Sequence, residues 1–300
     1  MSADDEFDLV TLGEAMVVLA PEHGERLATA EVATLRTAGA EVNVARTLAH
    51  LGRRVAWAGA LGDDPFGDRI VADLVASGVD ISSVTRDASA PTGLYAKDTD
   101  QHRATSTYYY RRNSAASKMD ATLLTRLPRG TVLHLSGITA AISDGGMQLI
   151  SAALNNRPNG SLVSFDVNFR PALWKGREAA GVLAELANAA DIVFVGLDEA
   201  TALWGTGSLE AIHELLPRPS VVVVKDGAIG ATSILSHGER VFEPSPVIDV
   251  VEPVGAGDAF AAGYLHGLIG GSPEFERLQL GHAAAGRAMM TTDDVGAHTR

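Results

Sequence analysis

The segment 252–263 constrains this chain more than any other, because its residues favour a tight turn that opens directly into a buried helix. The small residues Gly255, Ala256 and Gly257 precede Asp258, and an apolar run follows. The first amides of a helix lack partners within it and can bind an anion, and glycines let a phosphate approach the backbone. A carboxylate beside that cradle can accept a proton from a hydroxyl. The segment therefore predicts phosphoryl transfer to an alcohol, with Asp258 as the proton acceptor.

Asp258 is expected to be ionised at neutral pH. An unperturbed aspartate has a pKa of about 3.9, and the positive end of a helix dipole favours the anion. Such a carboxylate is a weak base, which suffices because the transition state is loose and little proton transfer precedes phosphoryl movement. Its main predicted task is to orient the hydroxyl in line with the phosphate.

Composition limits the class of protein. With 300 residues, of which 46% are hydrophobic and 31 are glycine, the chain can bury the core of a compact α/β enzyme. The absence of cysteine excludes disulfides and thiolate metal sites. A net charge of -13 argues against nucleic-acid binding. The acidic N-terminus resembles no signal peptide, and no apolar stretch reaches the roughly 20 residues of a membrane span. We expect a cytoplasmic protein without a membrane partner.

Short apolar runs predict the buried strands of a parallel sheet. Helical stretches are expected between the runs at 132–135, 162–166 and 192–195. An apolar stripe over 41–51 predicts a helix ended by Gly52. The predicted strands cover residues 7–13, 55–61, 132–135, 162–166, 192–195 and 221–224. No linker or internal repeat interrupts the pattern, so residues 1–300 are expected to form a single α/β domain.

Two extended segments, 15–37 and 92–112, are expected to form a small β lid over this domain. The second segment contains two tyrosine-rich strands, 92–97 and 105–111, which are predicted to pair as a hairpin. Strands with an exposed edge often pair with another chain. A homodimer or higher homo-oligomer is therefore expected.

From about residue 10 to about residue 292 the chain resembles the PfkB (ribokinase-like) family of carbohydrate kinases. Besides the turn before Asp258, it carries the family's small-residue motif at 38–52 and the sequence Gly-Asp-Asp-Pro-Phe-Gly at 62–67. The resemblance implies a mostly parallel sheet flanked by helices, with ATP and Mg²⁺ as cofactors. It also implies that Gly39 admits a sugar against the backbone and that Asn43 hydrogen-bonds the sugar hydroxyls. The structural alternative for Asn43 is a bond to its own backbone at the helix start.

The family's nucleotide contacts correspond to residues 225–230 and to a later helix. By resemblance they imply nucleotide-binding roles for Lys225, Gly227, Gly230 and His282. No Gly-x-x-x-x-Gly-Lys-Ser/Thr loop occurs anywhere in the chain, which excludes a P-loop kinase. No glycine fingerprint follows the first strand, which argues against a Rossmann oxidoreductase.

Three residues depart from the family pattern. The resemblance implies that Glu199 supports magnesium through water, but the asparagine that usually precedes it by three positions is Gly196. Glu252 replaces an aspartate near the loop where family members often bind a monovalent cation such as K⁺, so that requirement is open. His282 replaces the asparagine usually found near the adenine.

Within the family the chain is most similar to the 2-keto-3-deoxygluconate kinases. Residues 107–117 resemble their lid strand, and residues 166–174 resemble their Asp-x-Asn-x-Arg-x-x-Leu-Trp element. The resemblance implies phosphorylation of the 6-hydroxyl, giving 2-keto-3-deoxy-6-phosphogluconate. Guanidinium groups can bind the substrate carboxylate through paired charge-assisted hydrogen bonds. By resemblance, four side chains are expected to contact this sugar acid: Glu14, Tyr109, Arg111 and Arg170.

Two alternatives stay open. The first is a fructokinase or another neutral-sugar kinase of the same family, against which the arginines and tyrosines of the lid argue. The second is a non-catalytic sugar-binding sensor, which the intact turn before Asp258 argues against and Gly196 leaves open. The choice between epimers of the sugar acid is open as well. One of Arg111 and Arg112 is expected to lie at a solvated strand edge.

Overall fold

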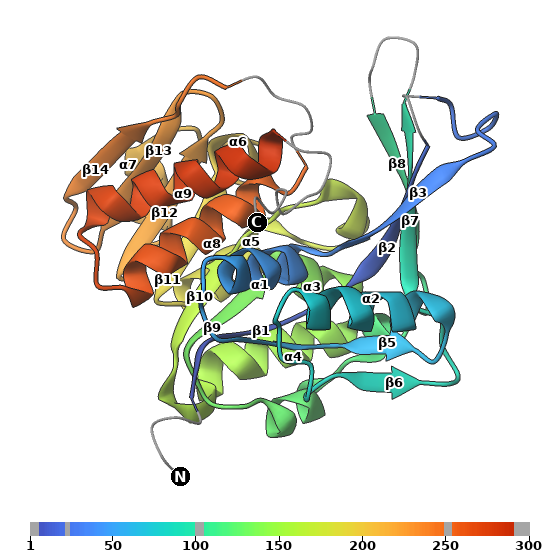
Figure 1. The fold of residues 1–300 in the computed structure, drawn as a ribbon. Coiled ribbons are helices and arrows are strands. Elements are labelled where there is room, and N and C mark those ends of the chain that lie inside the picture. Colours follow the sequence, from blue (N-terminus) through green and yellow to red (C-terminus); the bar gives the residue numbers. More distant parts are fainter. Residues whose placement is uncertain (1–5, 22–24, 100–104, 249–253, 291–300) are drawn as a thin grey trace.

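The computed structural model describes residues 6–21, 25–99, 105–248 and 254–290. Within them, a central eight-stranded sheet has the strand order β14-β13-β12-β11-β10-β9-β1-β4 (Figure 1). The strands from β12 to β4 in this order are parallel, and β13 and β14 form an antiparallel edge. The strands are β1 (Phe7–Leu12), β4 (Val55–Ala58), β9 (Gly130–Ser136), β10 (Leu162–Asp166), β11 (Ile192–Gly196), β12 (Val221–Asp226), β13 (Gly230–Leu235) and β14 (Arg240–Pro244).

Helices cover both faces of this sheet (Figure 1). One face carries α1 (Ala40–His50), α2 (Pro65–Ala76), α8 (Ala256–Ile269) and α9 (Glu274–Met289). The other carries α3 (Gly137–Ile142), α4 (Asp144–Asn156), α5 (Ala180–Asn188), α6 (Leu197–Trp204) and α7 (Leu209–Leu215). Short 3-10 helices lie at Ala116–Lys118, Ala121–Arg126, Pro158–Gly160 and Pro171–Leu173.

Successive residues of each strand pack into different cores. Val132 belongs to the core under α1 and α8, whereas Leu133 belongs to the core under α4 and α5. Both faces of the strands are therefore dry, which explains why the runs are apolar throughout instead of alternating. The predicted α/β class, with a mostly parallel sheet flanked by helices, is confirmed.

A second, four-stranded sheet stands apart from the first and is called the small sheet below (Figure 1). Its strand order is β3-β2-β7-β8, with β2 (Met16–Pro21), β3 (Ala33–Ala38), β7 (Gly93–Thr99) and β8 (Thr105–Tyr110). The predicted hairpin is confirmed, because β7 and β8 pair antiparallel. Residues 22–24 and 100–104 of the predicted lid segments lie outside the described residues.

The strand predicted over 55–61 is wrong in one respect, because it is two strands. β4 ends at Ala58, and β5 (Ala60–Gly62) pairs instead with β6 (Thr85–Asp87) in a small two-stranded sheet. At Gly59, between them, a Cβ would come within 2.7 Å of the Gly13 carbonyl oxygen. The chain thus leaves the central sheet at a position where a side chain would clash with the end of β1.

Asp64→Ala is expected to lower the free energy of unfolding by about 0.5–2 kcal/mol, the usual cost of losing an N-cap. Asp64 caps α2: its Oδ1 accepts the Gly67 N–H at 2.8 Å, and its Oδ2 accepts the Thr92 N–H at 2.8 Å. Partial burial acts to raise the pKa of Asp64, but the backbone donors of Thr92 and Gly67 prevail and lower it. Its stabilisation is therefore lost as the pH falls through the folded-state pKa.

Urea denaturation of wild type and variant at neutral and at strongly acidic pH measures this effect. The difference in unfolding free energy should shrink in acid. An equal difference at both pH values would contradict the capping role.

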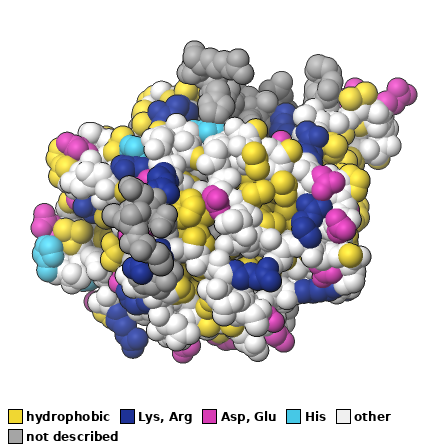
Figure 2. Space-filling view, turned by 60° about the horizontal axis from the view of Figure 1, so that its bottom comes forward, with side chains coloured by type: hydrophobic (Ala, Val, Ile, Leu, Met, Phe, Trp, Pro, Cys, Tyr) yellow, Lys and Arg dark blue, Asp and Glu magenta, His cyan; other side chains and the backbone are white. Residues whose placement is uncertain are grey.

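Charges of both signs are interspersed on the face drawn in Figure 2. Across the described parts of the chain, no helix is both long enough and apolar enough to cross a bilayer. The concentrations of charge that matter for function lie in the cavities described next.

Candidate active site

Two adjoining cavities lie beside the start of α8. The first, of about 420 Å³, is enclosed by the small sheet, the end of β1 and the segment that follows β10. The second, of about 650 Å³, lies between the β12–β13 turn, residues 245–248 and helices α8 and α9. Both are lined by Glu199, Lys225 and Gly257. This is the carboxyl-end edge of the parallel strands, where open α/β sheets bind ligands.

Every site residue predicted from the sequence lines one of the two cavities. The first cavity is lined by Glu14, Gly39, Asn43, Tyr109, Arg111, Arg170, Gly255 and Asp258. The second is lined by Gly227, Gly230, Ala256 and His282. Glu252 lies outside the described residues. The structure thus brings together the predicted substrate residues in one cavity and most of the predicted nucleotide residues in its neighbour.

The start of α8 is open to both cavities. Gly255, the residue before the helix, has φ +82°, a left-handed conformation that favours glycine. A Cβ on Gly257 would lie 3.4 Å from Lys225 Nζ, so the absence of a side chain keeps the helix terminus close to this cation. The first amides of the helix, the helix dipole and an ammonium group converge here, which suits an anion such as phosphate.

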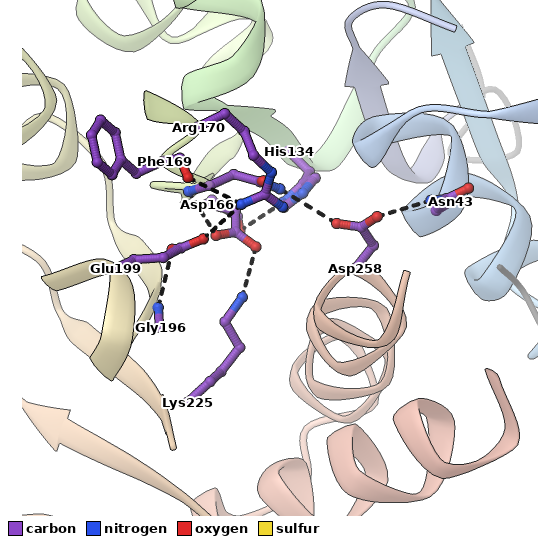
Figure 3. Close-up of polar contacts among 11 residues, drawn as sticks. Asn43, His134, Asp166, Phe169, Arg170, Gly196, Glu199, Lys225 and Asp258 are labelled. Carbon is purple, nitrogen blue, oxygen red and sulfur yellow. Dashed lines mark hydrogen bonds and ion pairs between the residues drawn. The ribbon is translucent and has the colours of Figure 1, made fainter. Parts of the chain in front are cut away.

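Asp258 lies in the first turn of α8, where Figure 3 shows it beside Asn43, and two asparagines donate to it. Asn43 Nδ2 donates to Oδ2 at 2.9 Å, and Asn168 Nδ2 donates to Oδ1 at 3.4 Å. Burial, with a further contribution from the Asp166 carboxylate, raises the pKa of Asp258 to about 7, although Asn43 and Lys225 act to lower it. The expectation of an ordinary low pKa is therefore wrong, because it considered the helix terminus and not the burial or the second acid.

Lys225 and Asp166 form an ion pair across the ends of two parallel strands. Lys225 Nζ lies 3.0 Å from Asp166 Oδ2, and Figure 3 shows the ammonium group pointing toward this carboxylate from below. Burial acts to lower the pKa of Lys225, but Asp166, Glu199 and Asp258 together raise it. The lysine therefore stays charged where the two cavities meet.

Glu199 has two partners. Its Oε2 accepts the Gly196 N–H at 3.2 Å, so it caps its own helix α6, and its Oε1 accepts from Arg170 Nη1 at 3.1 Å. Burial and the nearby Asp166 raise the pKa of Glu199. The described residues contain no cluster of three or more potential metal-ligating side chains. Mg²⁺ usually binds through few protein carboxylates together with phosphate oxygens and water, so it does not require such a cluster.

Arg111 connects the small sheet to the central one. It forms an ion pair with Glu14, which follows β1, and Ser114 Oγ donates to Glu14 Oε1 at 3.1 Å. Burial raises the pKa of Glu14 even though Arg111 acts to lower it. The Arg111 guanidinium also lies 5.6 Å from the centre of the Tyr109 ring. Arg112 is exposed, so the expectation that one of the two arginines is solvated is confirmed.

The second cavity is largely apolar. Its walls include Ile248, Phe260, Ala285 and Met289. The polar exception on α9 is His282, whose Nε2 lies 3.1 Å from the Glu243 carbonyl oxygen. A carbonyl only accepts, so Nε2 carries the proton, and burial lowers the pKa of this neutral ring. The part of this cavity with apolar walls and His282 suits a flat heterocycle such as a nucleobase.

Three residues that line the first cavity were not predicted as site residues from the sequence: Lys97, Asp166 and Asn168. Asp166 is the last residue of the strand predicted over 162–166, and such a strand end is a position where ligands bind. Lys97 is buried and lies two residues after Tyr95, so both side chains point to the same face of β7. That alternation was the signal which could have identified it. Asn168 is the asparagine of the Asp-x-Asn-x-Arg element at 166–174, but its contact with Asp258 spans 90 residues and has no signal in the local sequence.

Comparisons with known proteins agree with this geometry. The model of the pfkB family carbohydrate kinases matches residues 6–294. A 2-dehydro-3-deoxygluconokinase of Bacillus subtilis (strain 168) is 35% identical over 303 residues, which cover 97% of this chain and 92% of the relative. A 2-dehydro-3-deoxygalactonokinase of Haloferax volcanii is 32% identical over 287 residues, covering 93% and 89%. The crystal structure of a PfkB protein from Polaromonas sp. JS666 aligns with a TM-score of 0.84 at 34% identity, covering 94% and 95%.

Proposed function

This chain belongs to the PfkB family of carbohydrate kinases, and we propose that it transfers the γ-phosphate of ATP to the 6-hydroxyl of 2-keto-3-deoxygluconate. The product is 2-keto-3-deoxy-6-phosphogluconate. One observation carries the substrate class: the cavity that contains Asp258 is also lined by Arg111, Arg170 and Lys97. The relative in Bacillus subtilis, named for this same sugar acid, supports the choice.

The cations of the first cavity favour an acidic sugar over a neutral one. Arg111 is largely buried, with a side chain 10% exposed, and it directly follows β8, which pairs with the strand that contains Lys97. Arg111 pairs with Glu14 and Arg170 with Glu199, and a substrate carboxylate would add further charge-assisted hydrogen bonds to these guanidinium groups. A neutral sugar would displace water from the guanidinium groups without giving them a charged hydrogen-bond acceptor in its place. Sugar acids are therefore the substrates that this cavity fits.

In the proposed reaction, Asp258 accepts a hydrogen bond from the 6-hydroxyl and orients it toward the phosphate. The amides at the start of α8 and the Lys225 ammonium group bind the phosphate oxygens, and the apolar second cavity holds the adenine. Glu199 would hold Mg²⁺ through water, and the bound ion would neutralise charge on the phosphates. A monovalent cation such as K⁺ near Glu252 is part of the same proposal. The need for ATP places the reaction in the cytoplasm.

The specificity constant kcat/KM for the sugar acid is expected to fall as the pH drops through about 7. Asp258 can accept a proton only when it is ionised, and its pKa in the free protein is raised to about 7. The pH dependence of kcat/KM reports the pKa values of free enzyme and free substrate. Initial rates should be measured with magnesium in excess, so that the nucleotide stays in the MgATP form. A profile that stays flat from mildly acidic to mildly alkaline pH would contradict the role of Asp258 as base.

ADP release with MgATP and a panel of acceptors tests the proposed substrate. The panel contains 2-keto-3-deoxygluconate, its C4 epimer 2-keto-3-deoxygalactonate, gluconate, fructose and ribose. The epimer belongs in the panel because the relative in Haloferax volcanii is named for it. A clear preference for 2-keto-3-deoxygluconate is expected. Equal or better turnover of fructose would overturn the substrate while leaving the family unchanged, and no turnover would favour the sensor alternative.

We also propose that the chain forms a homodimer through the small sheet. The edge strand β8 exposes Tyr108, Tyr109 and Tyr110, whose side chains are about half exposed or more. Exposed aromatic side chains on a sheet edge favour pairing with another chain. Sedimentation equilibrium should give twice the chain mass of 31.3 kDa. A monomer at micromolar concentration would contradict the dimer.

A further inference from the structure

We infer that Asn168 is a positioning residue for Asp258, which together with Asn43 fixes both oxygens of the Asp258 carboxylate in the first cavity. This inference rests on the proposed function in that Asp258 is taken as the group which receives the sugar hydroxyl. Asn168 lies outside the turn that carries Asp258, and its inferred task is to orient the carboxylate, which is separate from substrate binding.

Two amide donors hold the carboxylate from two directions. Asn43 belongs to α1 and donates to Oδ2 (Figure 3), whereas Asn168 follows β10 and donates to Oδ1. Both asparagines are buried, at 3% and 4% exposure. With one donor on each oxygen, the carboxylate plane cannot rotate without breaking a hydrogen bond. The carboxylate therefore has a defined orientation before any substrate arrives.

The direction of each amide follows from its partner. An ionised carboxylate only accepts hydrogen bonds, so each asparagine must present its NH₂ group to Asp258. The Oδ1 atoms of both asparagines are buried without a hydrogen-bond partner among the described residues. A buried acceptor left without a partner costs free energy, which the donation to Asp258 has to offset. Because the buried Oδ1 atoms gain no hydrogen bond, local structure does not explain these two asparagines, whereas donation to Asp258 does.

The backbone of Asn168 is shaped to make this contact. Its φ is +42°, a left-handed conformation that asparagine adopts more readily than most residues. Its own N–H donates to Asp166 Oδ1 at 3.2 Å. The turn thus leaves the strand end at Asp166 and directs the Asn168 side chain to Asp258. Asn168 thus contributes a neutral donor to each of two neighbouring acids, its N–H to Asp166 and its Nδ2 to Asp258.

The charged groups around Asp258 come from several elements. They are Asp166 at the end of β10, Arg170 after β10, Glu199 on α6 and Lys225 on β12. Removal of Asn168 leaves all of these charges in place and takes away one donor that stabilises the ionised form. The carboxylate should then rotate more freely and should hold its proton to a higher pH.

Two variants separate the side chain from the backbone. Asn168→Gly removes the donor while keeping the positive φ, and Asn168→Asp keeps size and shape while replacing the donor with an acid. We expect Asn168→Gly to lower kcat about tenfold, since a hydrogen bond to a charged group is worth about this factor or more. The acid limb of kcat/KM should move to higher pH, further in Asn168→Asp than in Asn168→Gly. KM for MgATP should stay at the wild-type value.

Asn113→Gly is the matched control. Asn113 also has a left-handed backbone, with φ +59°, and it lines neither cavity. This variant should keep the wild-type kcat and pH profile. A purely structural role for Asn168 would lower the melting temperature and leave the pH profile of the folded enzyme unmoved.

Carboxyl-carbon NMR titration of Asp258 in the free protein tests the inference without any turnover. The resonance is assigned by its loss in Asp258→Asn, and its midpoint is compared in wild type and in both Asn168 variants. An upward shift of the midpoint supports the inference even if the proposed sugar is not the substrate, so the two failures are distinguishable. Unchanged midpoints together with unchanged kcat in either folded variant would overturn it.

Discussion

Asp258→Asn is expected to lower kcat with 2-keto-3-deoxygluconate about 10²–10⁴-fold, the range for loss of a positioned base. The amide has nearly the shape of the carboxylate, so both cavities should keep their form. It cannot accept the hydroxyl proton, and its NH₂ group would face the donors of Asn43 or Asn168. KM for either substrate should change little, because the loss falls on the transition state.

Steady-state kinetics on the folded variant measure this effect. Asp120→Asn is a control, since Asp120 lies outside both cavities and caps a short 3-10 helix. It should keep wild-type turnover. If Asp258→Asn kept most of the wild-type kcat, Asp258 would be neither base nor orienting group, and the proposed mechanism would fail.

The double variant Glu14→Gln/Arg111→Met is expected to raise KM for 2-keto-3-deoxygluconate about tenfold to a hundredfold, because a charge-assisted hydrogen bond is worth about 1.5–3 kcal/mol. Both residues must change together. Glu14 is 2% exposed and pairs with Arg111, so removing the arginine alone would leave a buried carboxylate without its partner. The double variant removes the cation and keeps the pair neutral.

Comparison of two acceptors makes this result specific. KM for fructose and KM for MgATP should stay near their wild-type values, so the preference for the acid should fall by the same tenfold to hundredfold. Arg112→Met is the control, because Arg112 is exposed and lines neither cavity, so this variant should preserve the preference. Equal losses for fructose and for the sugar acid would reduce Arg111 to a structural residue.

Part of this site could be predicted because short local motifs carry it. Glu14 and Lys225 were expected from the resemblance of such motifs to a known family, and both line the cavities. The turn at Gly255 could be predicted from the residues alone, since small residues leave helix amides open to an anion. These inferences need only local sequence.

Contacts through space could not be predicted in the same way. The raised pKa of Asp258 depends on burial and on Asp166, which lies on a different strand. The role of Asn168 depends on a left-handed residue whose side chain reaches a helix 90 residues later. The break at Gly59 depends on the crowded end of β1. In each case the deciding neighbour is set by the packing of elements and leaves no mark in the local sequence.

The helices α6 and α7 show a milder limit. Residues 197–215 were not predicted to be helical, although both segments are. Each is short, at 8 and 7 residues, so an apolar stripe has too few turns to become visible. Their caps, Glu199 on Gly196 and Ser208 on Ala211, became evident only in three dimensions.

The position of the phosphate in the product is the most direct test of the central claim. The enzyme is incubated with MgATP and 2-keto-3-deoxygluconate, and the purified product is examined by phosphorus–proton correlation NMR. The account predicts one phosphate coupled to the two protons on C6, with one ADP formed for each sugar phosphorylated. A phosphate on another carbon, or ADP released without a phosphorylated sugar acid, would contradict it.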